Sequence, residues 1–152
     1  MKKAKYDVQW NAQEKLLSIR IQGQFTQQDV KNWQQQLYVC AEAIPTASEF
    51  KLLLDERGYD YESTAVHHAK RDVLPKFLAR YQMILSVLPV AEQNLLVSET
   101  ELNTNNIRCC AMAMCHHNVE AMQQLQQQYG TEQQGYFGNI EEARAWISKK
   151  DL

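Results

Sequence analysis

The 152-residue chain is long enough for one domain with its own core, and its 45% hydrophobic and 22% charged residues are typical of globular proteins. Its net charge of −2, with acidic and basic residues interspersed, argues against nucleic acid as a partner. The start MKKAKYDVQW lacks the apolar run of a secretion signal, and MILSVLPVA is too short to span a membrane. We therefore expect a cytoplasmic protein whose four cysteines are reduced thiols.

The amino-terminal segment predicts a hairpin followed by a helix. Two alternating runs, YDVQW and KLLSIRIQG, are typical of antiparallel strands, and Gly23 is expected to end the second. A helix is predicted over FTQQDVKNWQQQLYVCAEAIP, with Thr26 and Asp29 spaced as a capping box and Pro45 as its stop. Its glutamines lie between regularly spaced apolar residues, so we interpret them as helix surface rather than as low complexity.

The central segment predicts a strand, a helix and an irregular stretch. FKLLLDERG indicates a strand buried on both faces. Apolar residues recur at helical spacing from Ser63, and Pro75 indicates either a kink in one helix or the start of a second. YQMILSVLP fits a continued helix or a strand equally well. Residues from about 82 to 106 are expected to form an excursion from the core fold.

The last third predicts strand, helix, strand and helix. IRCCAMAMC indicates a buried strand, HNVEAMQQLQQQYG a helix ended by Gly130, and QGYFGN a short strand. IEEARAWISKK closes the chain as a helix with Ile140, Ala143 and Ile147 inward. The alternation predicts one α/β domain over residues 1–152. It has a mostly parallel four- to five-stranded sheet, an N-terminal antiparallel hairpin and flanking helices.

Three stretches, in this order, resemble the STAS family, the domain of bacterial anti-sigma-factor antagonists, and especially its SpoIIAA-like branch. SIRIQGQFTQQDV is similar to the family's strand–Gly–Phe–Thr–x–x–Asp entry into the first helix. KLLLDERGYDYESTAV resembles the strand that ends in Asp and leads to the switch loop, and GYFGNIEEARAWI resembles the final strand with its EEA-x-x-W helix. The resemblance implies a STAS/SpoIIAA-like fold and a non-enzymatic regulatory or protein-binding module without a cofactor.

The resemblance also implies a switch and interaction loop that includes Asp55, Arg57, Gly58, Ser63 and Thr64. Thr64 falls where anti-sigma antagonists carry the residue whose phosphorylation abolishes partner binding. Glu62 and Ala65 stand where the family's motif has Asp and Gly, and Asp60 and Glu62 would repel a phosphate. A simple N-cap role accounts for Ser63 and is the interpretation we favour.

The SpoIIAA-like branch also resembles lipid-binding Sec14-type domains. This implies an alternative function as a carrier or sensor of a lipid or other small apolar ligand. The expected partner is accordingly a regulatory protein or an apolar small molecule. An exposed edge strand of the predicted hairpin also allows a homodimer.

Cysteines and histidines cluster in CCAMAMCHH, which raises a zinc site and a Cys–His nucleophile as further hypotheses. On a strand, Cys109 and Cys115 would face one side and Cys110 the other, so the thiols would not converge on a metal. His67 and His68 are adjacent on a predicted helix and point in different directions. We therefore predict no metal site.

Cys115, His116 and His117 lie at the carboxyl end of a predicted parallel strand. Open α/β sheets bind ligands at this end of their strands. We expect a pocket rim at this edge formed by His67, Cys115, His116 and His117. Adjacent Cys and His residues rarely form a catalytic pair, so an enzyme that uses Cys115 and His116 is only the third alternative. We predict no catalytic residue.

Overall fold

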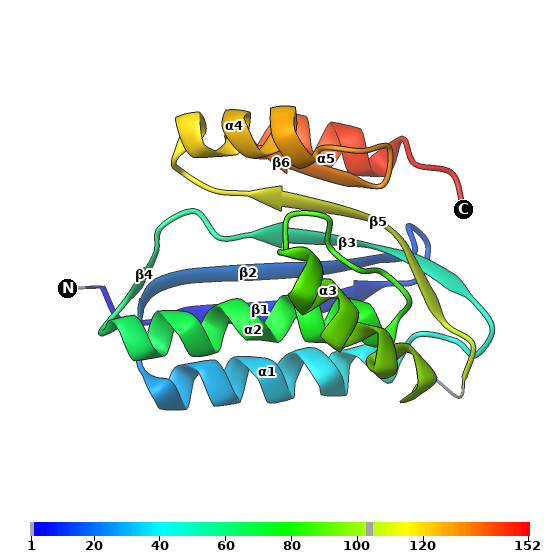
Figure 1. Ribbon diagram of the computed structural model, residues 1–152, viewed down its shortest axis with the longest axis horizontal. Coiled ribbons are helices and arrows are strands. Elements are labelled where there is room, and N and C mark those ends of the chain that lie inside the picture. Colours follow the sequence, from blue (N-terminus) through cyan, green and yellow to red (C-terminus); the bar gives the residue numbers. More distant parts are fainter. Residues whose placement is uncertain (1, 103–104) are drawn as a thin grey trace.

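A six-stranded mixed sheet forms the centre of the protein, and helices cover both of its faces (Figure 1). The computed structural model describes residues 2–102 and 105–152. The strands are β1 (Lys5–Asn11), β2 (Leu16–Phe25), β3 (Glu49–Asp55), β4 (Tyr59–Tyr61), β5 (Arg108–Cys115) and β6 (Gln134–Phe137). The helices are α1 (Gln27–Ala41), α2 (Thr64–Arg80), α3 (Val90–Leu96), α4 (Val119–Tyr129) and α5 (Ile140–Ser148), with the 3-10 helix η1 (Val97–Leu102).

The strand order is β1-β2-β3-β5-β6, and β4 pairs with the end of β2 outside this path. Strands β1 and β2 are antiparallel, and the other pairs are parallel. The predicted fold class, a mostly parallel sheet with an N-terminal antiparallel hairpin and flanking helices, is confirmed. The three-residue strand β4 is an addition that the sequence pattern did not indicate.

The hairpin follows the predicted alternation. Leu17, Ile19 and Ile21 are 0, 2 and 0% exposed and face the core together. The strand does not end at Gly23 as predicted but continues to Phe25. Gly23 has a φ of +82°, and a Cβ there would collide with the backbone carbonyl of Lys3, so only glycine fits as the amino-terminal segment passes.

Helices α1 and α2 begin at the predicted caps. Thr26 Oγ1 accepts a hydrogen bond from the Asp29 amide, while the Asp29 carboxylate accepts one from the Thr26 amide, which confirms the capping box. Ser63 Oγ caps α2 by accepting from the Val66 amide. The chain stays helical through Pro75, so the alternative of a second helix starting there is wrong.

Both alternatives for YQMILSVLP are wrong, because the segment after α2 is neither helix nor strand. Gln82 turns the chain with a φ of +67°. The side chain of Gln134 then holds the segment: its Nε2 donates to the Ile84 carbonyl and its Oε1 accepts from the Ser86 amide. Residues 90–102 form α3 and η1, and residues 103–104 of the expected excursion lie outside the described residues.

Two cores lie on opposite faces of the sheet. The larger one packs α1, α2 and α4 against β2, β3 and β5, and the smaller one packs α5 against β3 and β5. Cys109 belongs to the larger core and Cys115 to the smaller. Our prediction that the two thiols share a face was wrong, because a register shift opposite Phe50 and Lys51 inserts Cys110 and reverses the alternation.

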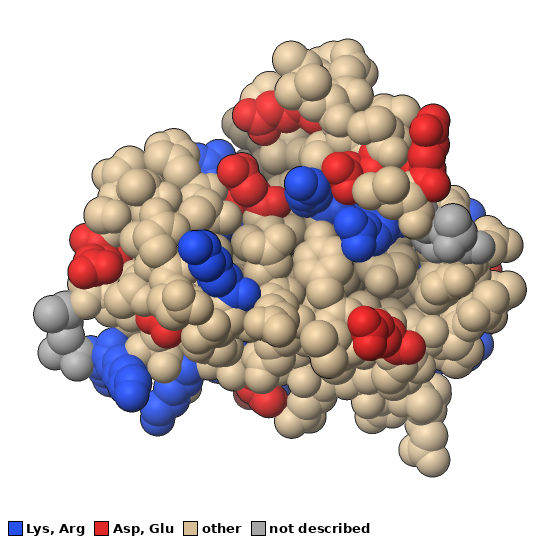
Figure 2. All heavy atoms as spheres, turned by 90° about the horizontal axis from the view of Figure 1, so that it is seen from below, with Lys and Arg blue, Asp and Glu red and all other residues tan. Residues whose placement is uncertain are grey.

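The closing helix agrees with its predicted face, since Ile140, Ala143 and Ile147 are 5, 0 and 1% exposed. Within the described residues, no helix combines the length and apolar character that a membrane span requires. Figure 2 shows acidic and basic side chains scattered over the side on which α1 lies. Neither sign of charge dominates that surface.

Candidate functional site

The carboxyl ends of β3 and β5 bring the predicted site residues to one edge of the sheet. Asp55 pairs with Cys115 in register, and the Glu56 amide donates to the Cys115 carbonyl at 2.9 Å. The His116 amide donates to the carbonyl of Phe137 at the end of β6. Residues 55–58 and 116–117 therefore meet at the edge where open parallel sheets bind ligands.

Asp55 is the centre of a charge network with two arginines. Its Oδ1 accepts from Arg20 Nη1 and Arg57 Nε, and its Oδ2 accepts from Arg57 Nη2, each at 2.9 Å. Burial opposes ionisation of this carboxyl, but the hydrogen bonds from Arg57 and the charges of Arg20 and Arg57 outweigh it, so its pKa lies below the usual value. The carboxylate thus stays charged and holds both guanidinium groups in place.

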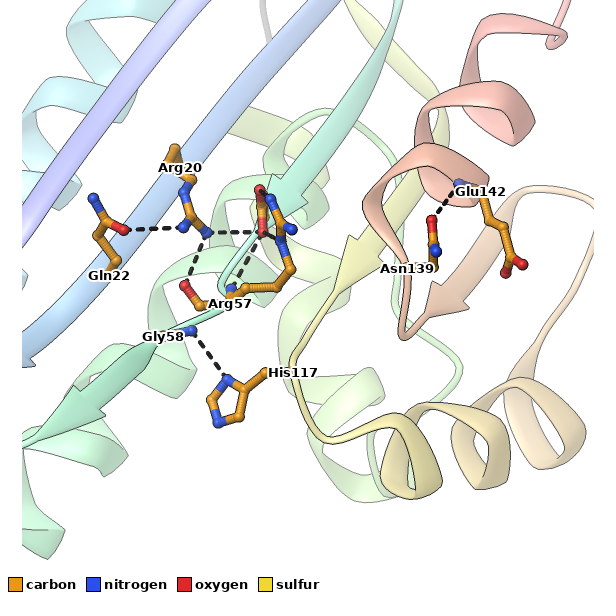
Figure 3. Close-up of polar contacts among 8 residues, drawn as sticks. Arg20, Gln22, Arg57, Gly58, His117, Asn139 and Glu142 are labelled. Atoms are coloured by element: carbon orange, nitrogen blue, oxygen red, sulfur yellow. Dashed lines mark hydrogen bonds and ion pairs between the residues drawn. The ribbon is translucent and has the colours of Figure 1, made fainter.

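The turn after β3 is tied down by further hydrogen bonds (Figure 3). Arg20 Nη1 donates to the Arg57 carbonyl at 2.9 Å, and the Gly58 amide donates to His117 Nδ1 at 3.0 Å. The carbonyl of Gly58 accepts from the Gly23 amide at 2.9 Å. Gly58 has a φ of +81°, a conformation that favours glycine. We call residues Asp55–Gly58 the loop base, and these contacts fix its position on the sheet.

A buried ion pair lies behind the loop base. Lys70 Nζ donates to Glu56 Oε2 at 2.6 Å, and the side chains are only 10 and 7% exposed. The same ammonium lies 4.5 Å from the ring centroid of Tyr59, at a distance typical of a cation–π contact. Sequence reasoning missed this pair, since Lys70 and Glu56 lie on different elements and share no motif.

The residues that follow form an exposed surface at the start of α2. Ser63 and Thr64 are exposed, as are Asp60 and Glu62, and Tyr61 is 40% exposed. The Tyr61 ring stacks on the His67 imidazole, with centroids 4.3 Å apart. We call residues Asp60–Thr64 together with His67 the outer loop surface. It combines hydroxyls, carboxylates and an aromatic stack in one place.

His67 joins this surface to the buried pair, because the Tyr59 hydroxyl and His67 Nδ1 lie 3.3 Å apart. Burial lowers the pKa of His67, and the nearby charge of Lys70 adds to the effect. Burial likewise lowers the pKa of His116, whose Nδ1 accepts from the Asn118 amide at 2.9 Å. The rings of His116 and His117 stack with centroids 4.1 Å apart. Both His67 and His116 are therefore neutral at pH 7.

Cys115 is fully buried beside α5, so its thiol belongs to the core and contributes no surface to a pocket rim. Burial raises the pKa of this thiol, and the charge of Asp55 adds to the effect. The thiol is therefore protonated, which offers no support for a Cys115–His116 nucleophile. Among residues 2–102 and 105–152, no three His, Cys, Asp or Glu side chains are grouped so as to hold a metal ion.

The side chains beneath α2 fill the space between this helix and the sheet. Val66, Val73 and Phe77 are 2, 5 and 0% exposed. A lipid bound under α2 would therefore have to displace core side chains. Packing of this kind gives the carrier hypothesis no direct support.

Comparisons with protein-family models, with curated proteins and with solved structures returned no match to this chain. Sequence reasoning identified Asp55, Arg57 and Gly58 but missed Arg20, which lies 35 residues from its partner Asp55. The sequence did offer one signal for this residue, because Arg20 is a charged side chain on the polar face of an alternating strand.

Proposed function

We propose that this chain is a non-enzymatic regulatory module of the STAS-like type that binds a protein partner through its outer loop surface. The observation that carries the proposal is the contrast between the loop base and the outer loop surface. Asp55 and Gly58 anchor the base to β2 and to the end of β5, while Tyr61, Ser63 and Thr64 remain exposed. A surface held in one conformation before binding loses less entropy when it docks.

The chemistry of the outer loop surface favours a protein partner. Tyrosine is enriched among the residues that dominate binding energy at protein interfaces, and Tyr61 presents its ring already stacked on His67. Asp60 and Glu62 add negative charge beside it, which would complement a basic patch on the partner. The buried thiol of Cys115 and the filled space beneath α2 favour this function over an enzyme or a lipid carrier.

Control by phosphorylation at Thr64 is the alternative to constitutive binding, and the charges around this residue disfavour it. A phosphate on Thr64 would lie at the start of α2, where free backbone amides favour an anion. The neighbouring carboxylates of Asp60 and Glu62 would repel it. We therefore propose that partner binding is constitutive at this surface rather than switched at Thr64.

Site-specific photo-crosslinking in cells that express the chain tests the proposal. A photoreactive residue in place of Glu62 should give a discrete adduct, and the same residue at Gln127, on the exposed side of α4, serves as the matched control. Excess unmodified chain should compete the adduct away, whereas excess Tyr61→Ala chain should compete poorly. Identical adducts at both positions, or equal competition by the Tyr61→Ala chain, would contradict the proposal.

A further inference from the structure

A groove of about 800 Å3 crosses the sheet face that α5 leaves partly uncovered. The register of β2 and β3 defines its floor, with Leu16 beside Lys51, Ser18 beside Leu53 and Arg20 beside Asp55. The β1–β2 hairpin forms one wall, and α5 forms the other through Arg144 and Ile147. The groove thus lies on the face opposite α1 and α2, and it reaches the loop base only at its Asp55 and Arg57 end.

Basic side chains outnumber acidic ones around this groove. Four cations line it, namely Arg20, Lys51, Arg57 and Arg144, against three carboxylates, those of Asp7, Glu14 and Asp55. The excess is notable in a chain whose net charge is −2. The lining thus has one more cation than carboxylates, whereas the chain as a whole is net negative.

At one end of the groove, two guanidinium groups share one carboxylate. Asp55 is almost buried, while the side chains of Arg20 and Arg57 are 35 and 38% exposed. Within the described residues, Arg57 Nη1 donates to no protein acceptor, and Arg144 on the wall forms no ion pair. Arg57 at this end and Arg144 on the wall therefore keep charged donors available to a ligand.

At the other end, Lys51 is a buried cation without a carboxylate. The residue is 6% exposed, and its Nζ contacts only the carbonyls of Ser148 and Lys150, at 3.4 and 3.3 Å. No acidic side chain in the described part of the chain lies within ion-pair distance of it. A buried ammonium with only two long hydrogen bonds can donate a further one, so Lys51 offers a polar contact to the far end of a ligand in the groove.

We propose that this groove binds a small organic oxyanion, either a phosphate ester or a carboxylate. Its anionic group would accept hydrogen bonds from Arg20, Arg57 and Arg144, and its body would lie over Ser18 and Leu53 toward Lys51. The four-residue spacing from Arg20 to Leu16, which pairs with Lys51, corresponds to about 13 Å of strand, enough for a ligand of mononucleotide size. This site does not depend on the proposed protein-binding function, since the outer loop surface contributes nothing to it.

Titration of the isotope-labelled full chain followed by nuclear magnetic resonance tests the site, with adenosine monophosphate and succinate as probes. At least one probe should shift the amide signals of Ser18, Leu53 and Ala145 saturably, with half-saturation below about 1 mM. The probe that binds distinguishes a phosphate ester from a carboxylate. Adenosine, which lacks the charge, should bind at least about tenfold more weakly than its monophosphate if the phosphate ester is the ligand.

Two arginine variants make the test specific. Arg144→Gln should weaken the binding about tenfold, and its exposed, unpaired position leaves the fold intact. Arg71→Gln, the same change at an exposed position on α2, should leave the affinity unchanged. Absence of saturable shifts with both probes, or equal affinities in wild type and Arg144→Gln, would overturn the proposal.

Discussion

The Gly58 amide donates a 3.0 Å hydrogen bond to His117 Nδ1 and so joins the turn after β3 to the end of β5. Because Nδ1 acts as the acceptor, a neutral His117 carries its proton on Nε2. This single contact couples two segments that are 59 residues apart in the chain. Because His117 is exposed, a single substitution can remove this hydrogen bond without changing the core.

The variant His117→Phe should loosen the loop base without disturbing the core. Phenylalanine can still stack on His116 but provides no acceptor, and the exposed Gly58 amide would turn to water at a cost of about 0.5–1.5 kcal/mol. We expect faster hydrogen exchange at the Gly58 amide than in wild type. His68→Phe, at an exposed position on α2, is the control. Unchanged exchange at Gly58 in His117→Phe would show that the bond does not hold the turn.

Breaking the Glu56–Lys70 pair should destabilise the protein more than replacing both partners. Lys70→Met leaves the Glu56 carboxylate buried without its cation, and we expect a loss of about 3–5 kcal/mol in the free energy of unfolding. The double variant Glu56→Leu/Lys70→Met leaves no buried charge and should recover most of that loss. Denaturant unfolding of the three proteins provides the comparison. A double variant as unstable as Lys70→Met would show that an unpaired Glu56 carboxylate is not the cause of the lost stability.

The fold shows which features a local pattern predicts and which depend on distant residues. The alternation of Leu17, Ile19 and Ile21 and the cap at Thr26 need only near neighbours, and both were predicted correctly. The segment after α2 is held by Gln134, about 50 residues away, so no local pattern could indicate its path.

The candidate site likewise combines residues that a local pattern predicts with residues whose roles depend on distant parts of the chain. Asp55 and Gly58 were predicted because KLLLDERGYDYESTAV resembles a strand that ends in Asp and leads to a switch loop. The ion pairs Arg20–Asp55 and Glu56–Lys70 each join separate elements, and no spacing in the sequence indicates which residues pair. The thiols of Cys109 and Cys115 were assigned to one face, because a bulge at Cys110 cannot be recognised from alternation alone.

Lowering the pH should reduce the free energy of unfolding through His67 and His116. Burial is the main cause that keeps the pKa values of His67 and His116 below the ordinary value of 6.5. The unfolded chain therefore binds protons that the folded chain does not, so the stabilisation is complete above about pH 6.5 and declines as the pH falls through that value. Unfolding in urea at pH 7.5 and 5.5 should show a smaller free energy at pH 5.5.

The double variant His67→Gln/His116→Gln isolates this effect. Its free energy of unfolding should vary less between pH 7.5 and 5.5 than that of wild type, because the two shifted groups are gone. His68→Gln keeps both groups and serves as the control. An equal pH dependence in wild type and the double variant would assign the effect to other groups.

Two glycines with nearly the same backbone angle should respond differently to alanine. Gly58 has a φ of +81°, and the nearest atom to an added Cβ lies 3.8 Å away, so Gly58→Ala should cost only the conformational penalty of about 1–2 kcal/mol. Gly23 has a φ of +82°, but its Cβ would collide with the Lys3 carbonyl. Gly23→Ala should therefore cost at least about 1 kcal/mol more. Thermal unfolding would measure the difference, and equal losses would contradict the close approach of Lys3.

We propose above all that the outer loop surface binds a protein partner. The most direct test is the affinity of the partner captured by crosslinking at position 62, measured with wild type, Tyr61→Ala and the exposed control Gln127→Ala. We predict at least a tenfold loss of affinity for Tyr61→Ala, since a central aromatic residue typically contributes more than about 1.4 kcal/mol to an interface, and no change for Gln127→Ala. Equal affinities for all three proteins would contradict the account.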